Sequence, residues 1–207
     1  MSDSKLNEAN FQVGDIVFIR VANFLYRRVA QATNSWTSHV GMLTGREDSE
    51  WMVAESAVPL SRYCPLSRFL GRSEGGRCAI MRLKSPLDPT APKRLQAEAA
   101  RRMRHWYHLG FDLDSRRQFC SKFVYEIYRE ALGVSIGTVQ SFRDLIEMNP
   151  ASPLAFWKMW FMGRIPWDRR TITPGTQYES DLLQPVYESH GNPGIDESQR
   201  QSRPNKR

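Results

Sequence analysis

The feature that most restricts the fold is a pair of strand-like segments joined by a short polar connection. Residues 38–44 and 51–56 are rich in apolar and β-branched side chains, a composition that favours extended structure. The connection, residues 45–49, starts with glycine and has the length of a hairpin loop. A hairpin of this kind requires an antiparallel sheet whose apolar side chains are covered by other elements.

A hairpin centred on Glu47 predicts which residues of its two strands lie opposite each other. In that register His39 faces Glu55, with Cβ atoms about 4.5–5.5 Å apart. A carboxylate beside an imidazole fixes the ring tautomer and stabilises the imidazolium, as a catalytic histidine requires. The alternative is that both side chains lie on a solvated sheet face, and a slip of one residue would separate them.

The remaining segments predict further strands and helices. Strands are expected over 16–20 and 77–83, long helices over 92–108 and 119–132, and short helices over 23–32, 65–70, 141–147 and 152–162. The termini, 1–10 and 188–207, are polar and are expected to be disordered. We therefore predict one α+β domain over 11–187, in which a small antiparallel sheet packs against helices on one side.

The net charge of +7 raises the question of acidic partners. The basic residues are spread along the chain, without zinc-finger spacing or an RNA-binding aromatic motif. A solvated basic surface is therefore favoured, and no specific nucleic-acid partner is expected. The N-terminus lacks the apolar core of a signal peptide, and no apolar segment approaches the roughly 18 residues of a membrane span. These observations together predict a cytoplasmic location.

One of the three cysteines has a position that suits a nucleophile. Cys120 lies at the start of the amphipathic segment 119–132, whereas Cys64 lies in a loop beside a proline and Cys78 lies in an expected strand. A thiol at a helix N-terminus has a lowered pKa, and the backbone N–H groups there can stabilise an oxyanion. The alternative is a small buried side chain without a chemical role. The wide spacing of the cysteines excludes a disulfide framework.

Four short motifs occur in an order that resembles a known enzyme family. They are Gly14-Asp15-Ile16-Val17-Phe18, Ser38-His39-Val40-Gly41, Ala54-Glu55-Ser56 and Phe119-Cys120-Ser121-Lys122-Phe123-Val124-Tyr125. Together they resemble the YiiX/YebB-like group, the circularly permuted branch of the NlpC-type papain-like cysteine peptidase superfamily, and the compact YebB-type members most of all. The resemblance covers residues 13–132 and implies a permuted papain-like (NlpC-type) α+β fold.

The resemblance also implies the roles of individual residues. Cys120 would be the nucleophile, His39 the general base, and Glu55 the group that orients His39. The stretch Leu109-Gly110-Phe111-Asp112 resembles the family's segment before the cysteine, with phenylalanine where tyrosine is usual. A substrate contact through that tyrosine hydroxyl would therefore be missing. The candidates for substrate contact are Trp36, Ser38, Asp112 and Ser121, although a core or loop position is commoner for a tryptophan such as Trp36.

Two other features, a pair of histidines and a Trp- and Met-rich segment, only weakly suggest a metal site and a membrane contact. His105 and His108 would share a face of the predicted helix 92–108 and could bind a metal, but no third ligand is evident. The Trp- and Met-rich segment 156–167 carries basic residues that would suit a membrane surface. Packing over the core or over the substrate cleft is the commoner arrangement and is favoured over peripheral lipid contact.

The implied reaction begins with attack of the Cys120 thiolate on an amide, ester or thioester carbonyl. His39 would hold the thiol proton and give it to the leaving group, and no metal or organic cofactor is needed. We therefore expect a thiol-dependent hydrolase that cleaves an amide bond in a peptide-like or N-acyl small molecule. The alternatives are an acyltransferase for lipid or acyl substrates and a non-catalytic ligand-binding module. The presence together of Cys120, His39 and Glu55 favours an enzyme.

Overall fold

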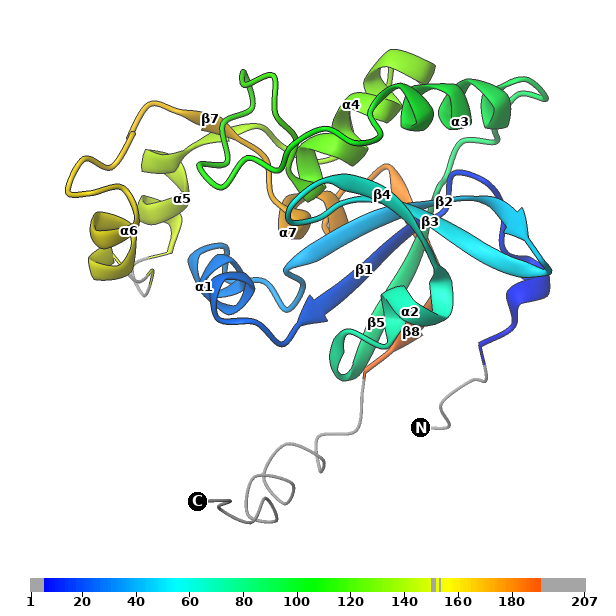
Figure 1. Cartoon of the computed structure of the whole chain (residues 1–207), viewed down its shortest axis with the longest axis horizontal. Helices are drawn as coiled ribbons and strands as arrows, with labels where there is room; N and C mark the ends of the chain where they lie inside the picture. The colour runs from blue at the N-terminus through cyan, green and yellow to red at the C-terminus, as the bar shows by residue number, and fades with distance from the viewer. Residues whose placement is uncertain (1–5, 150–151, 153, 191–207) are drawn as a thin grey trace, which may run out of the picture.

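A six-stranded antiparallel sheet forms the centre of the computed structural model, which describes residues 6–149, 152 and 154–190 (Figure 1). The strand order is β4-β3-β2-β1-β5-β8. These strands are β1 (Ile16–Val21), β2 (His39–Glu47), β3 (Glu50–Ser56), β4 (Ser61–Pro65), β5 (Ser73–Leu83) and β8 (Leu183–Ser189). Two further strands, β6 (Gln140–Ser141) and β7 (Arg170–Thr171), form a separate pair.

Short helices complete the predicted α+β architecture. They are η1 (Glu8–Asn10), α1 (Phe24–Ala32), α2 (Leu66–Leu70), α3 (Ala91–Arg101), α4 (Cys120–Leu132), α5 (Phe142–Met148), α6 (Leu154–Trp160) and α7 (Pro174–Tyr178). α4 is terminated by the next residue, Gly133, whose φ of +69° suits glycine just after a helix. α5 begins with a capping box in which Ser141 and Asp144 satisfy each other's backbone N–H groups.

The sheet is covered on both faces rather than on one side as predicted. On one face, side chains from β1, β2 and β5 pack against α3 and α4 through a core that includes Phe18, Val40, Met42, Leu95, Phe123 and Ile127. On the other face, α2 and the N-terminal segment cover a second core that includes Phe11, Val17, Leu43, Val53, Leu66 and Phe69. Alternate residues of each strand point to opposite faces, so the strands are apolar on both.

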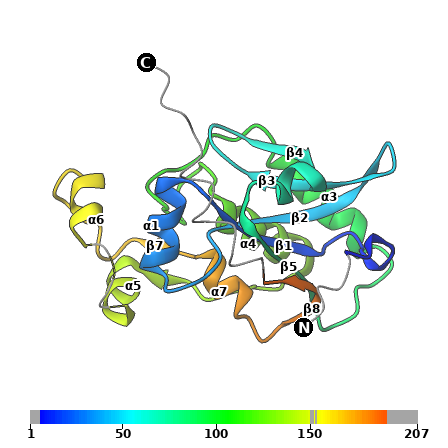
Figure 2. The same cartoon turned by 90° about the horizontal axis from the view of Figure 1, so that it is seen from below.

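A third apolar cluster lies beyond the sheet, at the end of the molecule where α1, α5 and α6 gather (Figures 1 and 2). Its rings meet mainly edge to face: Phe111 lies 5.8 Å from Phe119 and 6.2 Å from Trp157, and Phe142 lies 5.8 Å from Trp157. The inner side of the Trp- and Met-rich segment therefore packs on the body of the domain.

The β2–β3 hairpin forms as predicted, but its register differs from the predicted one by two residues. Leu43 lies opposite Val53 instead of Trp51, and a bulge interrupts the ladder between Leu43 and Gly45. The turn residues Asp48 and Ser49 have positive φ values of +47° and +69°, which suit a tight hairpin turn. A shift of two residues keeps every side chain on its predicted face, so His39 and Glu55 still share one.

Several other boundaries differ from the predictions. α3 ends at Arg101, and Arg104 has a φ of +62°, so His105 and His108 do not lie on a helix face. β4 and β8 were not predicted, and Glu8–Asn10 and the end of β8 at Ser189 lie beyond the predicted limits of 11 and 187.

The predicted terminal disorder falls largely on residues 1–5 and 191–207, which lie outside the described residues. Within the part of the chain that is described, no helix has the length and apolar character needed to cross a bilayer.

Candidate active site

Cys120 is the first residue of α4, as predicted. Phe119 precedes it in an extended conformation and provides no side-chain cap, so the first N–H groups of the helix are not occupied by a capping side chain. The thiol is free, and only 4% of the residue is exposed. Cys120 thus combines a helix N-terminus with a buried surrounding, in which electrostatic interactions are strong.

His39 and Glu55 form a hydrogen-bonded pair beside the thiol. Nε2 of His39 lies 2.6 Å from Oε2 of Glu55, and both side chains are fully buried. Among the described residues, Nδ1 of the ring makes no well-aligned hydrogen bond, and the thiol of Cys120 is the neighbouring group that acts on the ring. The carboxylate therefore holds Nε2 and leaves Nδ1 to exchange a proton with the sulfur.

The surroundings of these groups favour a thiolate and an imidazolium at neutral pH. Burial by itself would lower the pKa of His39, but Cys120 and Glu55 raise it to about 9. Burial also opposes ionisation of Cys120, yet His39, the Tyr107 hydroxyl and the Val40 backbone N–H together lower the pKa of the thiol. These shifts favour the nucleophilic form of the sulfur beside an acid that can protonate a leaving group.

Glu55 is surrounded by donors. Oε1 accepts hydrogen bonds from Nε of Arg62 at 3.0 Å and from Sγ of Cys64 at 3.4 Å, and Oε2 accepts from His39 and from Nη2 of Arg72 at 2.7 Å. Burial alone would raise the pKa of Glu55, but His39 and Arg72 bring it far below its usual range. Glu55 therefore stays ionised and can stabilise the imidazolium.

Cys64 contrasts with Cys120 in its ionisation. Burial and the charge of Glu55 raise the pKa of Cys64 to about 12. Its thiol consequently serves as a hydrogen-bond donor to the carboxylate, and Cys120 is the more acidic of these two thiols.

Aromatic side chains hold the imidazole ring of His39 from two directions. The ring of Phe69 stacks on it with a centroid distance of 5.4 Å and an angle of 27°, and Tyr26 meets it edge-on at 5.4 Å. The guanidinium of Arg72 lies over the ring of Phe69, 4.8 Å from its centroid. Arg72 thus contacts both Glu55 and the ring that supports His39, which fixes the geometry of the pair.

An apolar cavity opens beside Cys120, with a volume of about 580 Å³ that includes its open mouth. None of its lining residues is charged; they are Tyr26, Ala32, Thr33, Ser38, Tyr107, Phe111, Phe119, Cys120, Ser121, Phe142, Leu145, Trp157, Thr171, Ile172, Thr173 and Pro174. The lining comes from α1, α4, α5, α6, the segment around β7, the loop before α4 and the residue before β2. A lining of this composition suits an apolar group of a substrate.

The structure brings two of the four predicted substrate contacts to this cavity. Ser38 and Ser121 line it, and the hydroxyl of Ser121 also donates to the carbonyl of Ile172 at 2.7 Å. Trp36 is instead packed between Tyr178, at 5.3 Å, and the guanidinium of Arg77, at 4.5 Å. Asp112 lies 3.7 Å from Arg169 and is not part of the lining. Trp36 and Asp112 therefore lie outside the lining of this cavity.

Two tyrosines that sequence reasoning missed, Tyr26 and Tyr107, line the cavity together with Cys120. The hydroxyl of Tyr107 lies 4.0 Å from Sγ of Cys120 and is hydrogen-bonded to the hydroxyl of Tyr26. A bridge between Tyr107 and Gln118 brings the two segments together. Burial raises the pKa of both phenols, so they remain donors. No sequence pattern marks this contact, because it depends on a loop that folds back on the residues before α4.

The ionisation of Cys120 leads to a measurable prediction. We expect iodoacetamide at pH 7 to alkylate Cys120 rapidly and to spare Cys64, because only Cys120 has a lowered pKa. His39→Ala removes the group that lowers the pKa most, and should slow alkylation at pH 7 by roughly tenfold or more. Tryptic cleavage places Cys64, Cys78 and Cys120 in separate peptides, so mass spectrometry gives a rate for each thiol.

The pH dependence of this labelling provides the control. The Cys120 rate should fall as the pH decreases through the lowered thiol pKa, whereas the rate in His39→Ala should follow an unperturbed thiol near about 8.5 or above. Equal rates for Cys64 and Cys120, or no effect of His39→Ala, would contradict the ion pair and favour the non-catalytic binding module.

Comparisons with known proteins agree with the geometry. Residues 10–187 match a family model described as "Permuted papain-like amidase enzyme, YaeF/YiiX, C92 family". The uncharacterized protein YiiX of Escherichia coli (strain K12) is 26% identical over 175 residues, which cover 84% of this chain and 85% of that protein. A crystal structure described as "metalloprotein yiiX from Escherichia coli O157:H7" superposes with a TM-score of 0.79 and 28% identity, over 86% of this chain and 97% of that one.

The description of that crystal structure as a metalloprotein raises the question of a metal site here. Within the described part of this chain, no three or more His, Cys, Asp or Glu side chains are arranged to hold a metal ion. Glu55, the carboxylate next to His39, is already surrounded by Arg62 and Arg72. The residues present therefore do not fit a metal centre.

Proposed function

The chain belongs to the family of permuted papain-like amidases, and on this premise we propose that it hydrolyses the amide bond of N-acyl compounds through an acyl-enzyme on Cys120. A cysteine hydrolase is the general function that the family supports. The observation that carries the finer proposal is the uncharged cavity next to the thiol, because an apolar acyl chain can fill it without the loss of a charged group's hydration.

In the proposed reaction the thiolate of Cys120 attacks the amide carbonyl carbon. The oxygen gains negative charge, which the N–H groups at the start of α4 and the hydroxyl of Tyr107 can stabilise. The imidazolium of His39 gives its proton to the amine, and the C–N bond breaks. Water then gives a proton to His39 and attacks the thioester, which releases the acid and returns Cys120 to the thiolate.

The lining favours an N-acyl compound over an ordinary peptide. A peptide carries polar amide groups on both sides of the cleaved bond, and these would lose hydrogen bonds to water in a cavity without charged residues. An aliphatic acyl chain has no such groups and gains free energy by burial, about 0.8 kcal/mol per methylene.

A series of N-acyl amides with increasing chain length tests the proposal. With a fluorogenic amine as leaving group, we expect kcat/KM to rise roughly fourfold per added methylene until the cavity is full. Leu145→Trp, which introduces a larger side chain into the lining, should move the optimum to shorter chains. The exposed Lys93→Gln on α3 should leave the profile unchanged. A rate independent of chain length, or faster cleavage of peptide amides, would rule out the acyl specificity.

Acyl transfer is the second candidate, because the same thioester can react with an amine or alcohol instead of water. The observation in its favour is the apolar lining of the cavity beside Cys120, because an apolar site favours an organic acceptor over water. Mass spectrometry of the products, with a primary amine added to the assay, separates the two: a free acid indicates hydrolysis, and a new amide indicates transfer.

A further inference from the structure

The outer side of α6 carries apolar side chains that have no place in the core. Phe156 and Trp157 of this helix are buried. The exposed apolar residues are Leu154 and Met159 in the helix and Met162 in the turn that follows it. Met159 is 68% exposed and Met162 is 92% exposed. The solvent side of a surface helix normally carries polar side chains, so this side is unusual for a helix that only packs on a core.

A neighbouring helix extends this apolar surface. Phe24 of α1 is 60% exposed, and its ring meets Phe156 edge-on at 5.6 Å. We call the surface formed by Phe24, Leu154, Met159 and Met162 the α6 ridge. Exposed apolar groups that gather in this way mark a binding surface more often than single exposed side chains do.

Basic side chains accompany the α6 ridge. The guanidinium of Arg28 lies 5.0 Å from the centroid of Phe24 and 5.8 Å from that of Phe156. Lys158 and Arg164 are exposed within the same segment as the ridge methionines. Within the described residues no carboxylate forms an ion pair with Arg28, Lys158 or Arg164, and Asp168 of this segment is paired with Arg143 at 3.4 Å. The ridge thus has cations whose charge is not neutralised.

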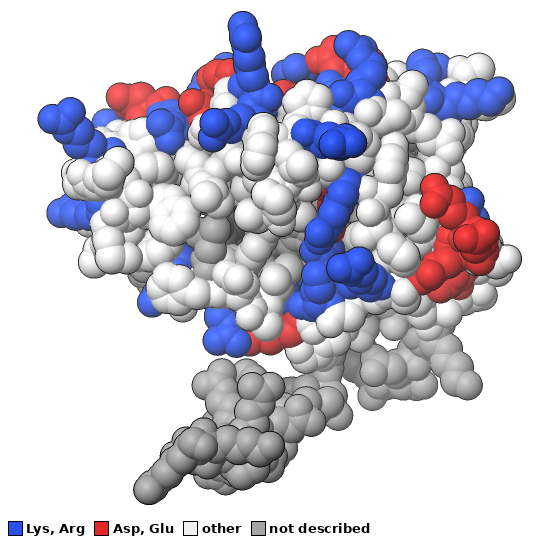
Figure 3. Space-filling view, in the orientation of Figure 1, with Lys and Arg blue, Asp and Glu red and all other residues white. Residues whose placement is uncertain are grey.

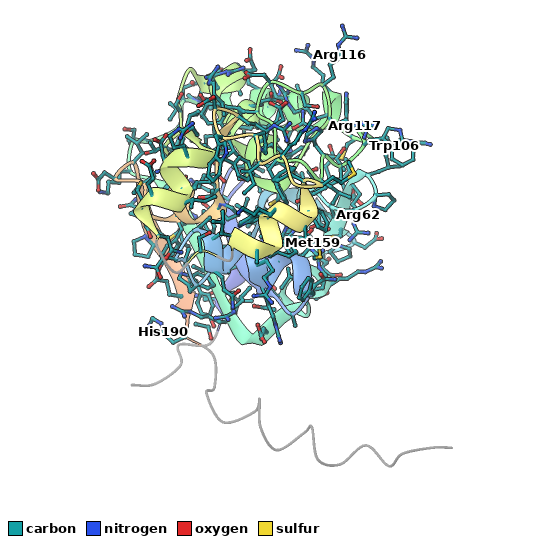
Figure 4. The ribbon with its side chains drawn as sticks, turned by 90° about the vertical axis from the view of Figure 1, so that its left-hand side faces the viewer. Arg62, Trp106, Arg116, Arg117, Met159 and His190 are labelled. Carbon is teal, nitrogen blue, oxygen red and sulfur yellow. The ribbon has the colours of Figure 1, made fainter. Side chains whose placement is uncertain are left out.

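The position of α6 suits a broad, flat partner. α6 lies at one extremity of the molecule, beyond α1 and α5 (Figures 1 and 2), and this end carries blue groups around uncharged surface in Figure 3. Figure 4 looks directly at this end, with α6 in front and Met159 near the middle, while Arg116 and Arg117 project above it. A projecting ridge reaches a flat surface more readily than a groove does.

The α6 ridge is also close to the substrate cavity. Trp157 lines the cavity, and Met159, two residues farther along α6, is on the outside. α6 therefore forms a wall with the cavity on one side and the ridge on the other.

We propose that the α6 ridge docks on the surface of a membrane that contains anionic lipids. Its apolar side chains would enter the boundary between headgroups and acyl chains, and Arg28, Lys158 and Arg164 would contact the acidic headgroups. Flexible methionines and unpaired basic residues match that chemistry. The sequence favoured packing of the Trp- and Met-rich segment on the domain, and the inner side of this segment does pack there. In this proposal its outer side makes the peripheral lipid contact that was the alternative expectation.

Vesicle co-sedimentation of the full chain tests the proposal. Vesicles of equimolar phosphatidylglycerol and phosphatidylcholine should bind the protein at about 0.05 M salt and release most of it at about 0.5 M. Lys158→Gln combined with Arg164→Gln should weaken binding roughly 30-fold. Leu154→Ser, Met159→Ser and Met162→Ser together should weaken it roughly tenfold or more.

The control removes the same charge from another part of the surface. Arg68→Gln combined with Lys93→Gln changes exposed residues of α2 and α3, and binding should stay within about twofold of the unmodified chain because these helices lie away from the ridge. Absence of binding at low salt, or an equal loss in this control, would overturn the proposal. Circular dichroism verifies that each variant is folded.

A fluorophore reports which part of the chain enters the lipid. In a Cys120→Ser background, an environment-sensitive dye attached at Met159→Cys should shift to shorter wavelength with vesicles, whereas the same dye at Lys93→Cys should not. A shift at position 93 alone, or binding without a shift at 159, would assign the contact to another surface. The binding measurements need no catalytic turnover, and the hydrolysis assay uses soluble amides. Failure of the membrane proposal can therefore be told apart from failure of the proposed amidase function.

Discussion

Cys120→Ala is expected to reduce kcat/KM for amide cleavage by at least about 10⁴-fold. The proposed mechanism has no second nucleophile. Burial and Glu55 raise the pKa of Cys64 to about 12, and the Cys64 thiol donates a hydrogen bond to the Glu55 carboxylate. Without the sulfur, His39 and Glu55 have no atom to activate for attack on the carbonyl. The loss is measured by steady-state kinetics with the preferred N-acyl amide and by labelling with a thiol-directed acyl probe.

Cys78→Ala provides the matched control, because Cys78 is also a buried cysteine that is not in a disulfide but lies in β5. Its replacement should leave kcat/KM within about threefold and should cost stability only through a small loss of packing. Undiminished labelling of Cys120→Ala, or an equal loss of turnover in Cys78→Ala, would refute the assignment of Cys120 as nucleophile.

The elements that carry Cys120, His39 and Glu55 could be predicted from local rules, whereas their convergence was implied by the family resemblance. The start of α4 follows from the amphipathic period after Cys120, and the two strands follow from their composition. The predicted register was displaced by two residues because the bulge near Gly45 and the turn at Asp48 were not anticipated. The prediction survived this error because strand side chains alternate with a period of two.

The groups that control the ionisation of this triad could not be predicted in the same way. Arg62 faces Glu55 across β3 and β4, and β4 has too few apolar residues to predict a strand. Arg72 follows α2, and Tyr107 reaches Cys120 through a loop. Each contact depends on the path of a connection between elements, and connections carry little periodic signal.

The cavity and β8 illustrate the same limit. The lining joins seven separate segments, so its volume depends on how these segments pack and not on any single motif. β8 contains Pro185, opposite Met81 at an irregularity of the ladder, and proline within a segment argues against a strand. The segment is nevertheless a strand because it lies at the edge of the sheet, where a missing N–H donor is tolerated.

Glu55→Ala is expected to destabilise the protein by about 3 kcal/mol or more and to lower kcat by at least about 100-fold. The carboxylate accepts hydrogen bonds from His39, Arg62, Arg72 and Cys64. Its removal leaves the buried donors, His39 and Cys64, without this acceptor. The imidazolium also loses the charge that stabilises it. Urea unfolding measures the first effect, and steady-state kinetics measures the second.

Glu55→Gln removes the charge of this side chain but keeps its size. The pH dependence of the resulting loss of stability therefore shows whether the charge is the cause. The lowered pKa of Glu55 stabilises the fold above the unfolded value near about 4.3, and this contribution is lost as the pH falls through the native pKa. The raised pKa of His39 stabilises the fold fully below about 6.5 and ceases to do so as the pH rises through about 9. The stability difference between wild type and Glu55→Gln should therefore be largest between about pH 5 and 6.5 and should shrink on both sides.

Glu130→Gln separates this effect from the loss of any carboxylate. Glu130 lies on the same helix as Cys120, is 47% exposed and pairs only with the neighbouring Arg129 among the described residues. Its replacement should change the free energy of unfolding by less than about 1 kcal/mol, with little dependence on pH. If Glu55→Gln matched Glu130→Gln in size and in pH profile, the buried pair of His39 and Glu55 would contribute nothing to the fold, and the imidazolium assigned to the active site would lose its support.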